Sequence, residues 1–235
     1  MLAPWVIEEL KSADLRDKRL NERFAVVVNE LAGQPSVSIP AACSGYPEMA
    51  AAYRFFDNEK VGFENVLQPH IDSTCKRMAE QPVVVVAQDT TEVELTRPKQ
   101  QVDGAGPLDG DKRRGCFLHP LMGFTPDGTP LGTVYAEVWT RANEAPTPKS
   151  DREKERKHTP IEDKESMRWV DSYRQTRELA VQIPETQFVC VADSEADIYE
   201  LMQEAQEEPR TVDWIVRACQ DRALQTDTKQ EKTAA

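Results

Sequence analysis

Two short apolar runs constrain the fold of this chain more than any other feature, and each ends at an aspartate. The first run, 83–87, leads through Gln88 to Asp89, and the second run, 188–192, leads to Asp193. Neither run alternates apolar with polar residues, so each predicts a strand buried on both faces, as in the central parallel strands of an α/β sheet. Ligands and catalytic groups collect outside the carboxyl ends of such strands, which is where both aspartates are expected.

Two carboxylates brought together at that edge can hold divalent metal ions, because Mg²⁺ and Mn²⁺ prefer oxygen ligands. Such ions support phosphoryl transfer on nucleic acid. An alternative is that the aspartates cap helices, since an Asp in front of a helix often accepts hydrogen bonds from its first turn. Ser194, followed three residues later by Asp197, resembles a capping box. From the residues alone, metal binding and capping both stay open.

The pattern along the chain predicts helices first and an α/β sheet afterwards. A hairpin is expected around Pro126-Asp127-Gly128, a turn sequence between two apolar runs. Strands that alternate with helices after such a hairpin indicate a mixed α/β sheet, in which the two aspartate-bearing strands lie side by side. The expected helices are 14–31, 47–56, 63–78, 162–182 and 196–205, and the expected strands are 83–88, 116–124, 131–139, 188–192 and 214–218.

Composition narrows the class of protein. The 235 residues carry a formal net charge of −12, which argues against nucleic-acid binding through overall positive charge. No stretch approaches the roughly 18 apolar residues of a membrane span, and the N-terminus lacks the pattern of a secretory signal. The five cysteines are scattered, without the close spacing of a zinc site. A cytoplasmic protein that does not bind membranes is the expectation.

Any contact with nucleic acid must therefore come from a local group of basic residues. Arg16, Arg19 and Arg23 lie on one flank of the expected helix 14–31, beside its apolar stripe. They form either a solvated helix edge or a face that follows DNA phosphates, and the pattern alone leaves both interpretations open.

The residues around these features resemble a known family. The runs 88–91 (Gln-Asp-Thr-Thr) and 192–199 (Ala-Asp-Ser-Glu-Ala-Asp-Ile-Tyr) are similar to the first two acidic motifs of bacterial cut-and-paste DDE transposases of the insertion-sequence-four family. The runs 15–20 and 51–58 resemble the N-terminal DNA-binding region of that family. The resemblance extends in order over nearly the whole chain, with further matches at Arg113-Arg114-Gly115, His119, Glu165-Ser166 and Trp169.

The resemblance implies a ribonuclease-H-like mixed sheet, incomplete in this chain, preceded by a small helical DNA-binding domain. It places the DNA-binding domain at 1–72 and a partial catalytic domain at 73–220. The remaining stretch, 221–235, shows no recurring apolar pattern and is expected to be a disordered tail. By the same resemblance, Asp89 and Asp193 are catalytic ligands of Mg²⁺ or Mn²⁺, supported by Thr90, Thr91 and His119. The implied DNA contacts are Arg16, Arg19, Arg23, Arg54, Arg113, Arg114 and Arg217.

The chain departs from the family pattern at two points. Family members usually carry Arg directly after the second Asp, where this chain has Ser194. The third acid, a Glu within a Tyr-Arg-Glu-Lys helix, is expected beyond Ala235, as are a β-rich insertion and dimerisation helices. Glu195 and Glu200 fit capping or surface roles better than the role of the third acid.

The leading hypothesis is a DDE transposase, represented by an N-terminal portion, that binds double-stranded DNA at transposon ends. In the complete protein it would cleave and transfer DNA strands with the help of metal ions. A second hypothesis is a non-catalytic DNA-binding fragment that inhibits an intact transposase by occupying DNA ends or by pairing with it. A self-contained ribonuclease-H-like nuclease needs a third carboxylate within the chain, and a degenerate remnant without activity is the fourth possibility.

Overall fold

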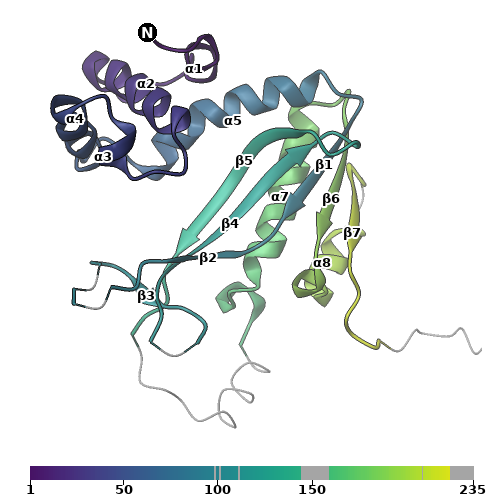
Figure 1. The fold of residues 1–235 in the computed structure, drawn as a ribbon. Coiled ribbons are helices and arrows are strands. Elements are labelled where there is room, and N and C mark those ends of the chain that lie inside the picture. Colours follow the sequence, from purple (N-terminus) through teal and green to yellow (C-terminus); the bar gives the residue numbers. More distant parts are fainter. Residues whose placement is uncertain (98, 101, 111, 144–158, 208, 223–235) are drawn as a thin grey trace, which may run out of the picture.

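The computed structural model describes residues 1–97, 99–100, 102–110, 112–143, 159–207 and 209–222. Figure 1 shows a group of helices set apart from a twisted sheet, with one long helix running between them. We refer to helices α1–α4 as the helical part, and to the strands with α7 and α8 as the sheet part. The tail expected at 221–235 lies outside the described residues from position 223 onward.

The helical part comprises α1 (Pro4–Glu9), α2 (Lys18–Gly33), α3 (Ile39–Ala42) and α4 (Tyr46–Phe56). Its core contains Leu15, Phe24, Val27, Ala52 and Phe55, and the stacked rings of Phe24 and Phe55 lie 5.7 Å apart. These apolar residues recur at helical spacing, which explains why α2 and α4 bury facing sides.

Helix α2 begins four residues later than the apolar pattern predicts. Asp17 is its N-cap, and the Asp17 carboxylate accepts a hydrogen bond from the Arg19 backbone N–H at 2.9 Å. The preceding Arg16 has a φ of 56°, a left-handed conformation that cannot continue a right-handed helix. The backbone at Arg16 and the cap at Asp17 therefore set the start of the helix.

The sheet has five strands in a mixed arrangement and two short additions. The five are β1 (Val83–Gln88), β4 (Arg114–Phe124), β5 (Pro130–Trp139), β6 (Gln187–Ala192) and β7 (Val212–Val216). They are ordered β5-β4-β1-β6-β7, antiparallel from β5 to β1 and parallel from β1 to β7. This order and these directions are those of a ribonuclease-H-like sheet, so the predicted mixed α/β fold is confirmed.

The two additions are β2 (Thr91–Glu94) and β3 (Gly106–Pro107), which both pair with β4. Strand β4 pairs first with β2 through residues 115–118 and then with β1 through residues 121–124. Asp89 and Thr90 thus connect β1 to β2, the two strands that pair with successive parts of β4. Strand β2 is not predictable from an apolar pattern, because its residues Thr-Glu-Val-Glu are largely exposed and carry no apolar run.

Helices complete the sheet part. The long helix α7 (Met167–Gln182) buries Trp169, Val170 and Tyr173 against the strands, and Figure 1 shows it lying along the sheet. Two 3₁₀ turns, η1 (Ile161–Asp163) and η2 (Ser194–Ala196), and the short helix α8 (Tyr199–Glu204) make up the remainder. Burial in β1 and β6 alternates along each strand, so the prediction of strands fully buried on both faces is wrong: one face is only half covered.

Helix α5 (Phe63–Ala79) connects the two parts and passes through position 72 without a break. On it, Arg77 donates two hydrogen bonds to the Glu9 carboxylate, at 2.7 and 3.0 Å, and one to the Leu131 carbonyl of β5, at 2.6 Å. His70 accepts from the Thr133 backbone N–H at 2.9 Å, so its other nitrogen carries the proton that Glu9 accepts, at 2.5 Å. These contacts tie α1, α5 and β5 together.

Candidate active site and nucleic-acid interface

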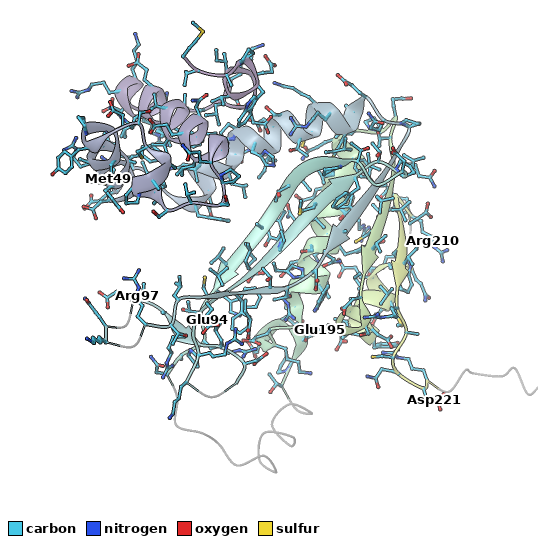
Figure 2. The ribbon with its side chains drawn as sticks, in the orientation of Figure 1. Met49, Glu94, Arg97, Glu195, Arg210 and Asp221 are labelled. Carbon is cyan, nitrogen blue, oxygen red and sulfur yellow. The ribbon has the colours of Figure 1, made fainter. Side chains whose placement is uncertain are left out.

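Asp89 and Asp193 each come directly after one of two neighbouring strands. Strands β1 and β6 are parallel, with Ala87 opposite Val191, and each aspartate follows this pair by two residues, just past the last residue of its strand. Both follow the carboxyl end of a central strand, where parallel strands present their ligand-binding edge. Figure 2 labels Glu195, which marks the end of β6 at this edge of the sheet. The structure therefore brings the two predicted acids to one edge.

Helix capping explains one of these aspartates in part and the other not at all. Asp89 is followed by β2, so it caps no helix. Asp193 is the N-cap of η2, and its Oδ1 accepts a hydrogen bond from the Glu195 backbone N–H at 2.8 Å. Its Oδ2 accepts from the Arg217 guanidinium at 3.3 Å. Arg217, predicted as a DNA contact, thus lies beside the second acid.

The residues present fit a divalent cation in the type of ligand and fall short in number. Asp89 and Asp193 supply carboxylate oxygens of the kind that Mg²⁺ and Mn²⁺ prefer. Within the described ranges, however, no three His, Cys, Asp or Glu side chains come together as a metal-binding group. Glu195, considered as a substitute acid, is bound at 2.8 Å by Arg168. Two ligands from this chain are therefore what the described site can offer.

Asp197, close behind Asp193 in sequence, has a structural role. It is 4% exposed, and its carboxylate accepts the backbone N–H groups of Cys219 and Gln220, both at 2.7 Å, and a bond from Arg222. The two backbone N–H groups, followed by Arg222, lower the pKa of Asp197 to about 2. The predicted capping box is wrong, because Ile198 is the N-cap of α8 and Asp197 instead holds the chain after β7.

A chain of polar side chains lies beneath the edge that carries the two acids. The Arg168 Nε donates to Thr90 Oγ1 at 2.7 Å, and that hydroxyl lies 2.8 Å from His119 Nδ1. The other nitrogen of His119 lies 3.2 Å from Gln88 Oε1, and the Gln88 amide donates to Cys190 Sγ at 3.4 Å. These contacts link α7, the connection between β1 and β2, β4, β1 and β6.

The hydrogen-bonding partners of His119 set its tautomer. Gln88 Oε1 can only accept, so Nε2 of His119 carries the proton and Nδ1 accepts from the Thr90 hydroxyl. His119 is fully buried, with its ring edge-on to Trp169 at 4.7 Å. Burial, with a smaller effect of nearby Arg168, lowers the pKa of His119 to about 4. The imidazole is therefore neutral near pH 7, and it contacts Thr90, whereas its supporting role stays a prediction.

Beside these hydrogen-bonded side chains lies an open cleft of about 710 Å³. Arg141 crosses it, donating to both Glu165 oxygens at 2.6 and 2.7 Å and to Asp109 at 2.6 Å, over the face of Phe117. Hydrogen bonds from Arg141 hold the pKa of Glu165 below its ordinary value despite burial. The cleft is lined by Thr90, Glu92, Asp109, Phe117, Trp139, Arg141, Thr159, Asp163, Lys164, Glu165, Ser166, Arg168 and Glu195.

The remaining predicted residues of the sheet part are Thr91, Arg113 and Arg114. Thr91 begins β2, pairs with Leu118 and does not line the cleft. Arg113 donates to Glu92 at 2.5 Å and to Glu94 at 3.1 Å, and Arg114 donates to Asn143. Their DNA contacts stay predictions.

In the helical part, three of the predicted arginines gather at one hollow. Arg19 and Arg23 of α2 meet Arg54 of α4 around a space of about 490 Å³, which Asp17 and Asn58 also line. Arg16, which precedes α2, does not line it. The structure thus joins Arg54 to the arginine flank of α2, a grouping that spacing along a single helix could not reveal.

Sequence reasoning missed Arg168, which contacts more of the site than any predicted arginine. It lies one residue before Trp169, which only the family resemblance singles out. No repeat or spacing distinguishes it from Arg174 and Arg177 on the same helix, since only the packing of α7 shows that it points toward Thr90. None of the helices within the described ranges is long and apolar enough to cross a membrane.

The chain is similar to solved structures over most of its length, and a family model matches its helical part. Among solved structures, the chain is similar to the Mos1 transposase paired-end complex with left transposon end, at 14% identity and a TM-score of 0.26. It is also similar to the Mos1 strand transfer complex, at 14% identity and a TM-score of 0.24. These alignments cover 82% of this chain and 57% and 56% of those chains, so it spans little more than half their length. Residues 2–61 match the model of the family described as transposase DNA-binding.

Proposed function

We propose that this chain is a transposase component that binds double-stranded DNA at transposon ends through its helical part. The observation that carries the proposal is the hollow lined by Arg19, Arg23 and Arg54, which lies within residues 2–61. Guanidinium groups form paired hydrogen bonds with phosphate oxygens, and such contacts set the position of a protein on a duplex. Arg23 and Arg54 have no ion pair with any described residue, and Arg19 lies 3.9 Å from Asp17.

We further propose the finer assignment to DDE transposases of the insertion-sequence-four family, with Asp89 and Asp193 as ligands of Mg²⁺ or Mn²⁺. When bound, such ions activate an attacking oxygen and stabilise a leaving one in strand cleavage and transfer. Asp89 is exposed and able to bind, whereas Asp193 must release Arg217 or share its carboxylate with it. The position of the two acids directly after the adjacent parallel strands β1 and β6 supports this assignment.

One observation favours a second function, a DNA-binding fragment or inhibitor that does not itself cut. Within the described ranges no third carboxylate joins Asp89 and Asp193 as a metal group. On this proposal the chain occupies DNA ends, or pairs with an intact transposase, without cleaving by itself.

DNA binding tests the first proposal. Fluorescence anisotropy with duplexes that carry the DNA flanking the coding sequence should show binding that weakens as salt rises. The triple change Arg19→Gln, Arg23→Gln and Arg54→Gln should lower affinity by about 100-fold and reduce the slope of log K against log salt by about 3. The matched control is Lys11→Gln, Lys18→Gln and Lys60→Gln, which removes three charges outside the hollow. Equal losses in both triples would remove the hollow from the interface.

Metal binding tests the second proposal by a readout other than cleavage. A ligand that binds the folded chain raises its unfolding temperature by mass action, so millimolar Mn²⁺ should stabilise the parent. The stabilisation should vanish in Asp193→Asn and in Asp89→Asn, and differential scanning fluorimetry measures it. Asp197→Asn serves as control, because Asp197 holds the chain after β7. An equal shift in all four proteins would show that Mn²⁺ binds elsewhere.

A further inference from the structure

We propose that Arg168 is a positioning residue that sets the separation of Asp89 and Asp193 by bridging the two chain segments that carry them. The proposal rests on the metal site of the proposed function. It assigns to α7 a role that neither the acidic motifs nor the arginine flank of α2 indicates.

The hydrogen bonds of a single guanidinium carry the argument. Arg168 Nε donates to Thr90 Oγ1 at 2.7 Å, and its NH2 group donates to Glu195 Oε2 at 2.8 Å. Thr90 directly follows Asp89, and the backbone N–H of Glu195 donates to Asp193. Each acid is therefore only one or two residues away from an atom that Arg168 holds. The third nitrogen of Arg168 donates to the Glu165 carbonyl at 2.7 Å, which fixes the guanidinium itself.

The surroundings of Arg168 make the bridge stiff. Its side chain is 11% exposed, and its guanidinium carbon lies 5.2 Å from the Trp169 ring centre and 5.5 Å from that of Trp139. Thr90 is held from its other side by His119 at 2.8 Å. A side chain with all three nitrogens engaged and little exposure cannot turn toward a DNA phosphate without breaking these bonds. Arg168 therefore acts on the acids and not on the nucleic acid.

Charge and position predict opposite outcomes when Arg168 is changed. A cation near two metal-binding carboxylates repels a divalent ion, so its removal should tighten metal binding if Arg168 acts only as a charge. If Arg168 acts by position, its removal should loosen the two acids and weaken metal binding. Loss of a group that orients metal ligands typically lowers affinity by 10- to 100-fold.

The experiment is isothermal titration calorimetry of the full chain with Mn²⁺. Arg168→Gln should raise the Kd for Mn²⁺ about tenfold or more, and Arg168→Lys should raise it as well, because one ammonium cannot span both partners. The matched control is Arg174→Gln on the same helix, since Arg174 grips Glu204 with two bonds at 2.6 and 2.8 Å away from the acids. An unchanged or lower Kd in Arg168→Gln overturns the proposal.

A second pair of variants decides the question if Arg168→Gln does not fold. Thr90→Val removes the hydroxyl that Arg168 holds without changing any charge, and Thr90→Ser keeps that hydroxyl. The Kd should rise in Thr90→Val and stay near the parent value in Thr90→Ser, whereas equal values in the two variants overturn the bridge.

Asp193→Asn separates this proposal from the one on which it rests. If the parent does not bind Mn²⁺, or if Asp193→Asn binds it equally well, the metal site fails and the bridge fails with it. If Asp193→Asn loses binding while Arg168→Gln and Thr90→Val retain it, the metal site stands and only the bridge is wrong.

Discussion

The helical part and the sheet part use their arginines in opposite ways. In the sheet part, seven arginines pair with carboxylates at 3.6 Å or closer, namely Arg113, Arg141, Arg168, Arg174, Arg177, Arg217 and Arg222. Arg114 instead donates to the Asn143 side chain. In the helical part, Arg16, Arg23 and Arg54 have no ion pair with any described residue, and Arg19 is only 3.9 Å from Asp17.

The difference shows why net charge misleads for this chain. The hydrogen-bond donors of an arginine bound to a carboxylate are occupied, and its charge is neutralised. Such an arginine stabilises the structure and is little able to bind a phosphate. An arginine without such a partner keeps both available. The formal charge of −12 belongs to the chain as a whole, whereas DNA contact depends on the local group at the hollow.

The largest expected effect falls on the buried polar chain of the sheet part, which has no counterpart in the helical part. His119→Gln should lower the free energy of unfolding by about 2–3 kcal/mol at pH 7.5, because it leaves buried hydrogen-bonding groups without partners. Urea unfolding followed by circular dichroism measures the change.

The same variant should change the acid dependence of stability. The folded pKa of His119 is lowered to about 4 from an ordinary value of 6.5. As pH falls between these values the unfolded chain takes up a proton that the folded chain refuses. Stability therefore falls by about 1.4 kcal/mol per pH unit over that range, and His119→Gln should lack this contribution. A variant with the same acid slope as the parent would show that His119 titrates normally.

A smaller effect is expected at the joint between the two parts. Glu9 is 17% exposed at its side chain and accepts from both Arg77 and His70, so Glu9→Gln should cost about 2 kcal/mol, less than a fully buried pair. The control on the same helix is Glu8→Gln, whose partner Lys11 is 3.8 Å away and exposed. That change should cost no more than about 0.5 kcal/mol by urea unfolding. Equal costs would mean that the joint contributes nothing.

The smallest effect is expected when the arginines of the hollow are given a carboxylate partner, as the paired arginines of the sheet part have. Asn58 lines the hollow and accepts from the Lys60 backbone N–H at 3.0 Å, a bond that an aspartate can keep. Asn58→Asp should lower DNA affinity about fivefold, roughly 1 kcal/mol, by giving the arginines a carboxylate. Anisotropy measures it, with Gln175→Glu on α7 as the control that adds the same charge elsewhere. Identical affinities in the two variants would place DNA away from the hollow.

Prediction from sequence succeeded where a local pattern has one physical solution. The apolar runs before Asp89 and Asp193 could be satisfied only by central strands, and the Pro126-Asp127-Gly128 turn lies between β4 and β5 as predicted. The prediction of a helix start at 14 was wrong, since Asp17 is the cap and Arg16 takes a left-handed backbone. Strand β2 was missed because pairing with β4, and not apolar content, makes it a strand.

The sequence by itself determined the apolar strands, the amphipathic helices and the two acids, because these depend on the order of apolar and polar residues over short distances. Only the tertiary structure decided which arginines are free and which are paired. Arg168 and Glu195 are separated by 27 positions, and Arg23 and Arg54 by 31, so no local pattern relates them. Their neighbours are set by how α7 packs on the sheet and α2 on α4, and packing of that kind is the sum of many weak contacts across the whole chain.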